Sequence, residues 1–179
     1  MRIGIDISQL TYSNTGVANY LKQLVLELVR QDKKNEYVLF YSSLRGNLDP
    51  AFMESLKGLQ VSIKKSKLPP LILDMLWNRL HIMPIESFIG DVDLFITSDW
   101  VEPPVKKAKK ATILYDLIVY KYPRESTKKI VETQKRKLKW VKKESEAIFC
   151  ISQATMNDAK DILKISQEKL HVIYPGFTL

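Results

Sequence analysis

The sequence predicts an α/β domain of the Rossmann-like, doubly wound type, with a mainly parallel sheet and helices on both faces. Short continuous apolar runs, among them "RIGIDI" at 2–7 and "AIFCIS" at 147–152, are typical of strands buried on both faces. Amphipathic helical patterns separate these runs, and such alternation is typical of a parallel sheet. With 179 residues the chain is long enough for a core, so we expect one domain over 1–179.

The strands are expected where apolar runs rich in isoleucine, valine and aromatic residues lie between turn signals. In chain order they cover 2–7, 36–42, 59–63, 92–98, 111–115, 147–152 and 170–174. Three loops then follow strands at the carboxyl edge, at 8–16, 97–107 and 116–124. Ligands of open parallel sheets bind at this edge, so these loops are the expected site.

The helices are expected between these strands. In 17–29 the apolar residues recur at helical spacing, which predicts an amphipathic helix. A short helix is expected over 50–57, and 68–90 is expected to be helical on either side of its proline. Helices over 125–144 and 154–164 separate the last strands.

Three features of the sequence favour a cytoplasmic protein. The start, "MRIGIDISQL", contains an acid and lacks a long apolar stretch, so no signal peptide is expected. No apolar run approaches the roughly 18 residues of a membrane span. The single cysteine, Cys150, lies in an apolar run and is interpreted as a small core residue.

Positive charge is concentrated in one part of the chain. Between Lys106 and Lys143 there are 14 lysines and arginines against three acids, a net +11 in a chain of net +8. The first interpretation of the helical segment 128–144 is a surface helix with solvated charges. The second is docking on an anionic membrane surface through 128–143, at the inner membrane face, with Trp140 at headgroup level. Nucleic-acid binding comes third, and no nucleic-acid partner is expected because no reading motif is present.

The loop "SQLTYSNTG" before the first helix offers two interpretations. Gly16 stands where backbone N–H groups at a helix start can hold a phosphate. Asn14 or Thr15 can instead simply cap that helix. Only one glycine of the dinucleotide fingerprint is present, which disfavours a nicotinamide cofactor.

Metal sites have little support in the sequence. His81, His171 and Cys150 are too far apart for a zinc pattern, and His171 fits the edge of a strand. Acids surround the strand at 92–98, and a solvated strand end is the preferred interpretation. They are Asp91, Asp93, Asp99 and Glu102.

Four stretches together resemble the N-terminal half of family 4 retaining glycosyltransferases (glycosyltransferase group 1, GT-B fold). "MRIGIDISQL…NTGVANYLKQLVLEL" is similar to the opening strand, glycine loop and first helix. "WNRLHIMPIESFIGDVDLFITSDWVEPP" resembles a strand leading to a small-polar loop and a proline pair. "KKATILYDLIVYKYP" resembles the strand before a His-Asp-Leu motif, and "AIFCISQATMNDAKDILKISQEKLHVIYPG" resembles a later helix and strand.

The resemblance implies transfer of a sugar from a nucleotide-sugar to an acceptor hydroxyl with retained configuration, without a cofactor or a metal. Asp116 matches the aspartate of the His-Asp-Leu motif, whereas Tyr115 stands in place of its histidine. A tyrosine donates a hydrogen bond but carries protons poorly at neutral pH. Gly16 would approach the donor phosphates, and its neighbours Asn14 and Thr15 are further candidates for substrate binding. The acceptor side would hold Ser98, Asp99 and Trp100, and Ser152 would cap a helix at the cleft.

The family also has a C-terminal domain that supplies most donor contacts, and we expect it in cis or as a separate chain. The expected function is therefore the acceptor-binding half of a transferase, acting on a glycan or lipid-linked acceptor such as a glycolipid or a cell-surface polysaccharide. A non-catalytic binding subunit or regulator of the same fold is the alternative, favoured by Tyr115. A nucleotide binder unrelated to sugars is a third.

Overall fold

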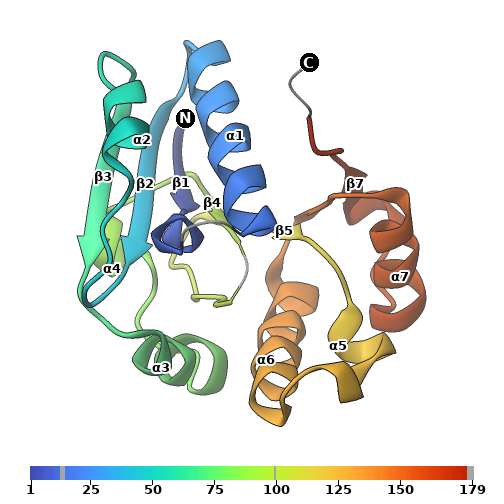
Figure 1. The fold of residues 1–179 in the computed structure, drawn as a ribbon. Helices are drawn as coiled ribbons and strands as arrows, with labels where there is room; N and C mark the ends of the chain where they lie inside the picture. Colours follow the sequence, from blue (N-terminus) through green and yellow to red (C-terminus); the bar gives the residue numbers. More distant parts are fainter. Residues whose placement is uncertain (13–14, 99, 177–179) are drawn as a thin grey trace.

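The computed structural model describes residues 1–12, 15–98 and 100–176. Within them lies a seven-stranded sheet of order β3-β2-β1-β4-β5-β6-β7, in which all neighbouring strands are parallel (Figure 1). The strands are β1 (Arg2–Asp6), β2 (Glu36–Ser42), β3 (Val61–Ser66), β4 (Leu94–Thr97), β5 (Lys109–Leu114), β6 (Ala147–Cys150) and β7 (Leu170–Val172). The predicted Rossmann-like α/β fold is confirmed.

The longer helices are close to their predicted positions. They are α1 (Gly16–Gln31), α2 (Pro50–Ser55), α6 (Lys128–Glu144) and α7 (Gln153–Leu163). The shorter ones are η1 (Ser8–Thr11), α3 (Pro70–Leu73), η2 (Asp74–Arg79, a π-helix), α4 (Glu86–Ile89), α5 (Ile118–Lys121), η3 (Pro123–Glu125) and η4 (Gln167–Lys169). The region 68–90 is more broken than predicted, because a loop with left-handed backbone at His81 and Met83 separates η2 from α4.

Both faces of the sheet are covered. On one face α1 and α2 pack on alternate residues of β1 and β2, such as Ile5 and Leu39. On the other face α3, η2 and α4 pack on the intervening residues, with Trp77 beside Phe40. The helices α6 and α7 continue this second layer over the strands β5 to β7. Inner strands such as β1 and β2 are buried on both sides, so their sequences are nearly continuous apolar runs, whereas the edge strand β3 has exposed polar positions.

The helix α6 carries one lysine into the core, so the interpretation of 128–144 as a helix with solvated charges is wrong for Lys137, although it holds for exposed lysines such as Lys139 and Lys143. Lys137 is buried, and its ammonium donates to the backbone carbonyl of Ser98 and to the Thr112 hydroxyl. An uncompensated buried ammonium is costly, so these partners fix how α6 packs on β5.

A second buried lysine continues this polar chain. Lys110 Nζ lies 2.9 Å from Glu102 Oε1 and 3.0 Å from Glu144 Oε2. The Thr97 hydroxyl donates to Glu102 and lies 2.7 Å from that of Thr112. We call the five residues Lys110, Glu102, Thr97, Thr112 and Lys137 the buried polar chain.

Among the acids around 92–98, the expectation of a solvated strand end is therefore wrong for Glu102, whose exposed fraction is 0%. Its negative charge sits beside the cation of Lys110, and such pairs allow a carboxylate to be buried. Asp91 and Asp93 are exposed, as expected, and Asp99 lies outside the described residues. His171 is exposed on the edge strand β7, also as expected.

Within the described ranges, none of the helices combines the length and the apolar character that crossing a membrane requires.

Gly4 in β1 allows a close approach between the sheet and its second helical layer. A Cβ atom at this position would lie 2.7 Å from Phe95 Cδ2 and 2.9 Å from Ile89 Cδ1. Both neighbours are buried, so neither can move aside freely.

We predict that Gly4→Ala lowers the free energy of unfolding by about 1–3 kcal/mol, the usual cost of overpacking a core. Urea denaturation followed by circular dichroism measures it. Gly16→Ala is the matched control, because a Cβ at Gly16 meets no atom within 4 Å. Equal stability of the two variants would show that the side chains around β1 can make room for a methyl group.

Candidate binding site at the carboxyl edge of the sheet

Three adjoining cavities open where β1, β4 and β5 end. The first, about 460 Å³, lies over Asp6 and Trp100, and the second, about 230 Å³, lies between Trp100 and Tyr115. The third, about 640 Å³, extends from Tyr115 and Asp116 along α1. Val17 lines all three cavities, so they adjoin one another around the start of α1.

The start of α1 is built by Thr15. Its hydroxyl accepts the backbone N–H of Ala18 at 3.1 Å, which makes Thr15 the N-cap, as the capping interpretation expected. Gly16 is the first residue of the helix and lines the third cavity. It has open space around it, so packing within the chain does not require glycine here. Asn14 lies outside the described residues.

Tyr115 is buried immediately after β5. Its hydroxyl lies 3.3 Å from Ser98 Oγ, and its ring meets Tyr20 edge-to-face at 5.8 Å. Thr155 donates to its backbone carbonyl at 3.0 Å. The structure thus brings the predicted residues Tyr115 and Ser98 together, although they are 17 residues apart in the sequence.

Asp116 points the other way and is exposed. Its Oδ1 accepts the backbone N–H of Ile118 at 3.0 Å, a local bond at the start of α5. It lines both the second and the third cavities. Its carboxylate therefore has a structural role and also faces the candidate site.

The segment after β4 is fixed from two sides. Lys137 donates to the carbonyl of Ser98, and Asn78 donates to that of Trp100 at 2.9 Å. Trp100 lines the first and second cavities, whereas Asp99 lies outside the described residues.

Ser152 caps α7, as expected, by accepting the N–H of Thr155 at 3.1 Å. It is not among the residues that line the three cavities. Its link to the site is indirect, through Thr155 and the carbonyl of Tyr115.

Asp6 is a candidate that sequence reasoning missed. It ends β1, lines the first cavity and is buried, with Ser8 donating to its Oδ1 through both N–H and O–H. Burial raises the pKa of Asp6, although the Ser8 hydrogen bonds and the charge of Lys137 oppose the increase. An acid at the carboxyl end of the first strand was the available signal, and "RIGIDI" contains it.

No cluster of three or more histidine, cysteine, aspartate or glutamate side chains that could hold a metal ion occurs in the part of the chain that the structure describes. Cys150 is buried in the core under α7, as predicted, and burial raises its pKa to about 11. A thiol in this state is a poor nucleophile at neutral pH.

Comparison with protein-family models and with curated proteins gave no match for this chain. Its function is therefore inferred from the fold and from the residues at the carboxyl edge.

We predict that Asp6→Asn stabilises the protein at neutral pH. Asparagine keeps an oxygen for Ser8 and removes a charge that burial disfavours. We expect Tm to rise by about 2–4 °C at pH 7, the shift that about 1 kcal/mol produces in a domain of this size.

The effect of Asp6→Asn should depend on pH. The folded-state pKa of Asp6 is raised above 3.8, so the protonated carboxyl group favours the folded state. As the pH rises above 3.8 the group ionises, and its buried charge increasingly lowers the stability of the fold. The advantage of Asp6→Asn should therefore shrink as the pH falls toward 3.8. Scanning calorimetry at several pH values measures the difference in Tm between the variant and the parent chain. A variant that is less stable than the parent chain at pH 7 would contradict the prediction.

Proposed function

We propose that this chain is the acceptor-binding half of a retaining glycosyltransferase of the family 4 type that its sequence resembles. The observation that carries the proposal is the convergence of Trp100, Tyr115 and Asp116 with the start of α1 around adjoining cavities. These are positions to which the resemblance assigns substrate contacts. Ligands of open parallel sheets bind at the same edge.

The lining of the first cavity suits a polyhydroxylated ligand. Tyr12 and Trp100 offer aromatic surface on which a sugar ring can pack, while Asp6, Ser8 and Gln9 offer hydrogen-bonding groups. A mostly apolar lining with a few polar groups is typical of small-molecule sites. We therefore assign this cavity to the acceptor.

The reaction would take place near Asp116. An oxocarbenium-like transition state is stabilised by negative charge, and the departing diphosphate by positive dipoles. Asp116 is an exposed carboxylate, and the start of the 16-residue helix α1 beside it provides such a dipole. The remaining donor contacts would come from a second domain, in cis or on a separate chain.

A non-catalytic binding subunit or regulator with this fold is the second candidate, and Tyr115 favours it. Its hydroxyl lies inside the chain beside Ser98, where the resemblance places a histidine. A site with this tyrosine can hold a sugar without moving a proton.

Ligand-observed NMR tests the binding proposal. We predict that mono- and oligosaccharides bind the chain weakly, and that Trp100→Ala weakens this binding at least about fivefold by removing one wall of two cavities. Tyr122→Ala is the matched control, because Tyr122 is exposed and lines none of the three cavities. A thermal melt of each variant verifies folding.

Absence of saccharide binding, or equal weakening by both variants, would contradict the proposal. Binding of nucleotides alone, with no sugar contribution, would instead favour a nucleotide binder unrelated to sugars.

Binding does not distinguish a transferase from a regulator, but Tyr115→His in the presence of a donor-binding domain does. The transferase proposal predicts sugar transfer already with Tyr115. Transfer only with histidine would identify the natural chain as a binding subunit.

A further inference from the structure

Exposed large apolar side chains are concentrated in one small part of the described chain. Of its 12 exposed large hydrophobic residues, five lie between positions 71 and 83. They are Leu71, Met75, Leu80, Ile82 and Met83, and we call them the apolar patch. Such concentration marks an interaction site more often than scattered exposed residues do.

Backbone hydrogen bonds connect the segment that carries these side chains. Leu71 and Met75 are four residues apart across α3 and η2, and the N–H of Leu80 donates to the carbonyl of Met75 at 2.9 Å. The N–H of Ile82 donates to the carbonyl of Leu76. The exposed residues at 80, 82 and 83 therefore follow the helix directly, in a loop whose backbone is bonded to the helix.

This loop is held firmly in a strained conformation. His81 and Met83 have φ values of 53° and 61°, which non-glycine residues rarely adopt. His81 contacts the carbonyl of Trp77 and the carboxylate of Glu144, both at 2.8 Å, and Trp77 Nε1 donates to the carbonyl of Met83. Strain of this kind persists only where surrounding contacts impose it. The exposed side chains are thus displayed by a fixed scaffold.

Positive charge lies directly beside the patch. Trp140 of α6 stacks on His81 at 3.6 Å and donates through Nε1 to the carbonyl of Asn78. The ammonium groups of Lys139 and Lys143 lie 5.4 Å and 4.9 Å from the Trp140 ring, and both side chains are exposed. They border the loop that carries Leu80, Ile82 and Met83.

Two acids of this region, Asp74 and Glu144, already have cationic partners. Asp74 is paired with Arg79 and Arg136, and Glu144 is paired with Lys110. Although burial alone would raise the pKa of each acid, these partners hold the pKa of both below the ordinary range, so both stay ionised and engaged. The excess charge of Lys139 and Lys143 is therefore available to an outside partner.

We propose that the apolar patch and the adjoining lysines of α6 form a docking surface for an anionic lipid bilayer. The apolar side chains would enter the boundary between headgroups and acyl chains, and Lys139 and Lys143 would contact anionic headgroups. The surface offers positive charge for anionic headgroups and fixed apolar side chains for the bilayer interior. This combination favours an anionic bilayer over a partner that carries charge alone. The inference does not depend on the proposed transfer reaction.

Vesicle co-sedimentation tests this surface with the chain itself. We expect binding to phosphatidylcholine vesicles with about 30% phosphatidylglycerol and at least about tenfold weaker binding to phosphatidylcholine alone. Lys139→Glu with Lys143→Glu, and separately Leu80→Ser with Ile82→Ser, should each weaken binding to the anionic vesicles about tenfold or more.

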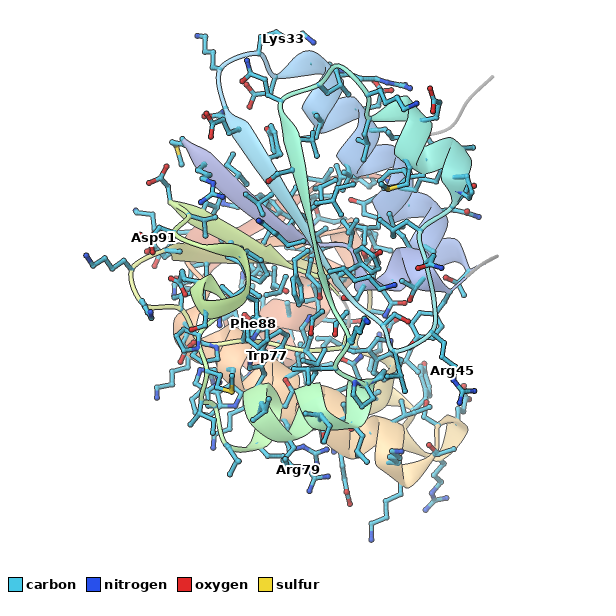
Figure 2. The ribbon with its side chains drawn as sticks, turned by 90° about the vertical axis from the view of Figure 1, so that its left-hand side faces the viewer. Lys33, Arg45, Trp77, Arg79, Phe88 and Asp91 are labelled. Atoms are coloured by element: carbon cyan, nitrogen blue, oxygen red, sulfur yellow. The ribbon has the colours of Figure 1, made fainter. Side chains whose placement is uncertain are left out.

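Matched controls use equally exposed residues elsewhere. Lys33→Glu with Lys34→Glu repeats the charge change at the end of the molecule opposite Arg79 (Figure 2). Leu44→Ser removes one exposed apolar side chain outside the patch. Both controls should bind within about twofold of the parent chain, and circular dichroism verifies that all variants fold.

Three results with vesicles would overturn the proposal. They are no binding to anionic vesicles, equal loss in the Lys33 and Lys34 control, and full binding by the Leu80 and Ile82 variant. Capture of the chain by polyglutamate but not by vesicles would also overturn it, and would identify an acidic protein as the partner.

Discussion

The buried charge of Lys137 is the constraint on which the carboxyl edge of the sheet depends. An ammonium group removed from water must find acceptors, and here these include the carbonyl of Ser98 and the hydroxyl of Thr112. The hydroxyl of Thr112 continues through Thr97 to Glu102, which neutralises the second buried lysine, Lys110. The helix α6, the strands β4 and β5 and the segment after β4 are thereby joined through one set of polar contacts.

The order and type of the main elements could be predicted from the sequence because a strand buried on both faces must be a continuous apolar run. "RIGIDI" and "AIFCIS" show this directly. Buried charges could not be predicted, because a lysine in a basic helix has the same local pattern whether it faces water or the core. Lys137 and Glu102 became visible as core residues only when the packing of α6 against β4 and β5 was known.

The site was predictable to the extent that it follows from topology. Parallel strands end at the same edge of the sheet, so the proximity of Ser98 and Tyr115 followed from the strand assignment. The capping roles of Thr15 and Ser152 followed from the local sequence. Asp6 was missed although it stands at the carboxyl end of the first predicted strand, because that position alone does not tell a buried acid from an exposed one. The apolar patch was missed for a similar reason, since its exposure depends on the loop at His81 and Met83.

Hydrogen exchange after Lys137→Met tests the central role of the buried charge most directly. Methionine preserves most of the apolar volume and removes the ammonium. We predict faster amide exchange in peptides that contain Ser98 and Glu102, with exchange in β2 and in the first half of α1 unchanged. If exchange near Ser98 and Glu102 equals that of the parent chain, Lys137 does not hold this edge of the sheet, and the central role of its buried charge is contradicted.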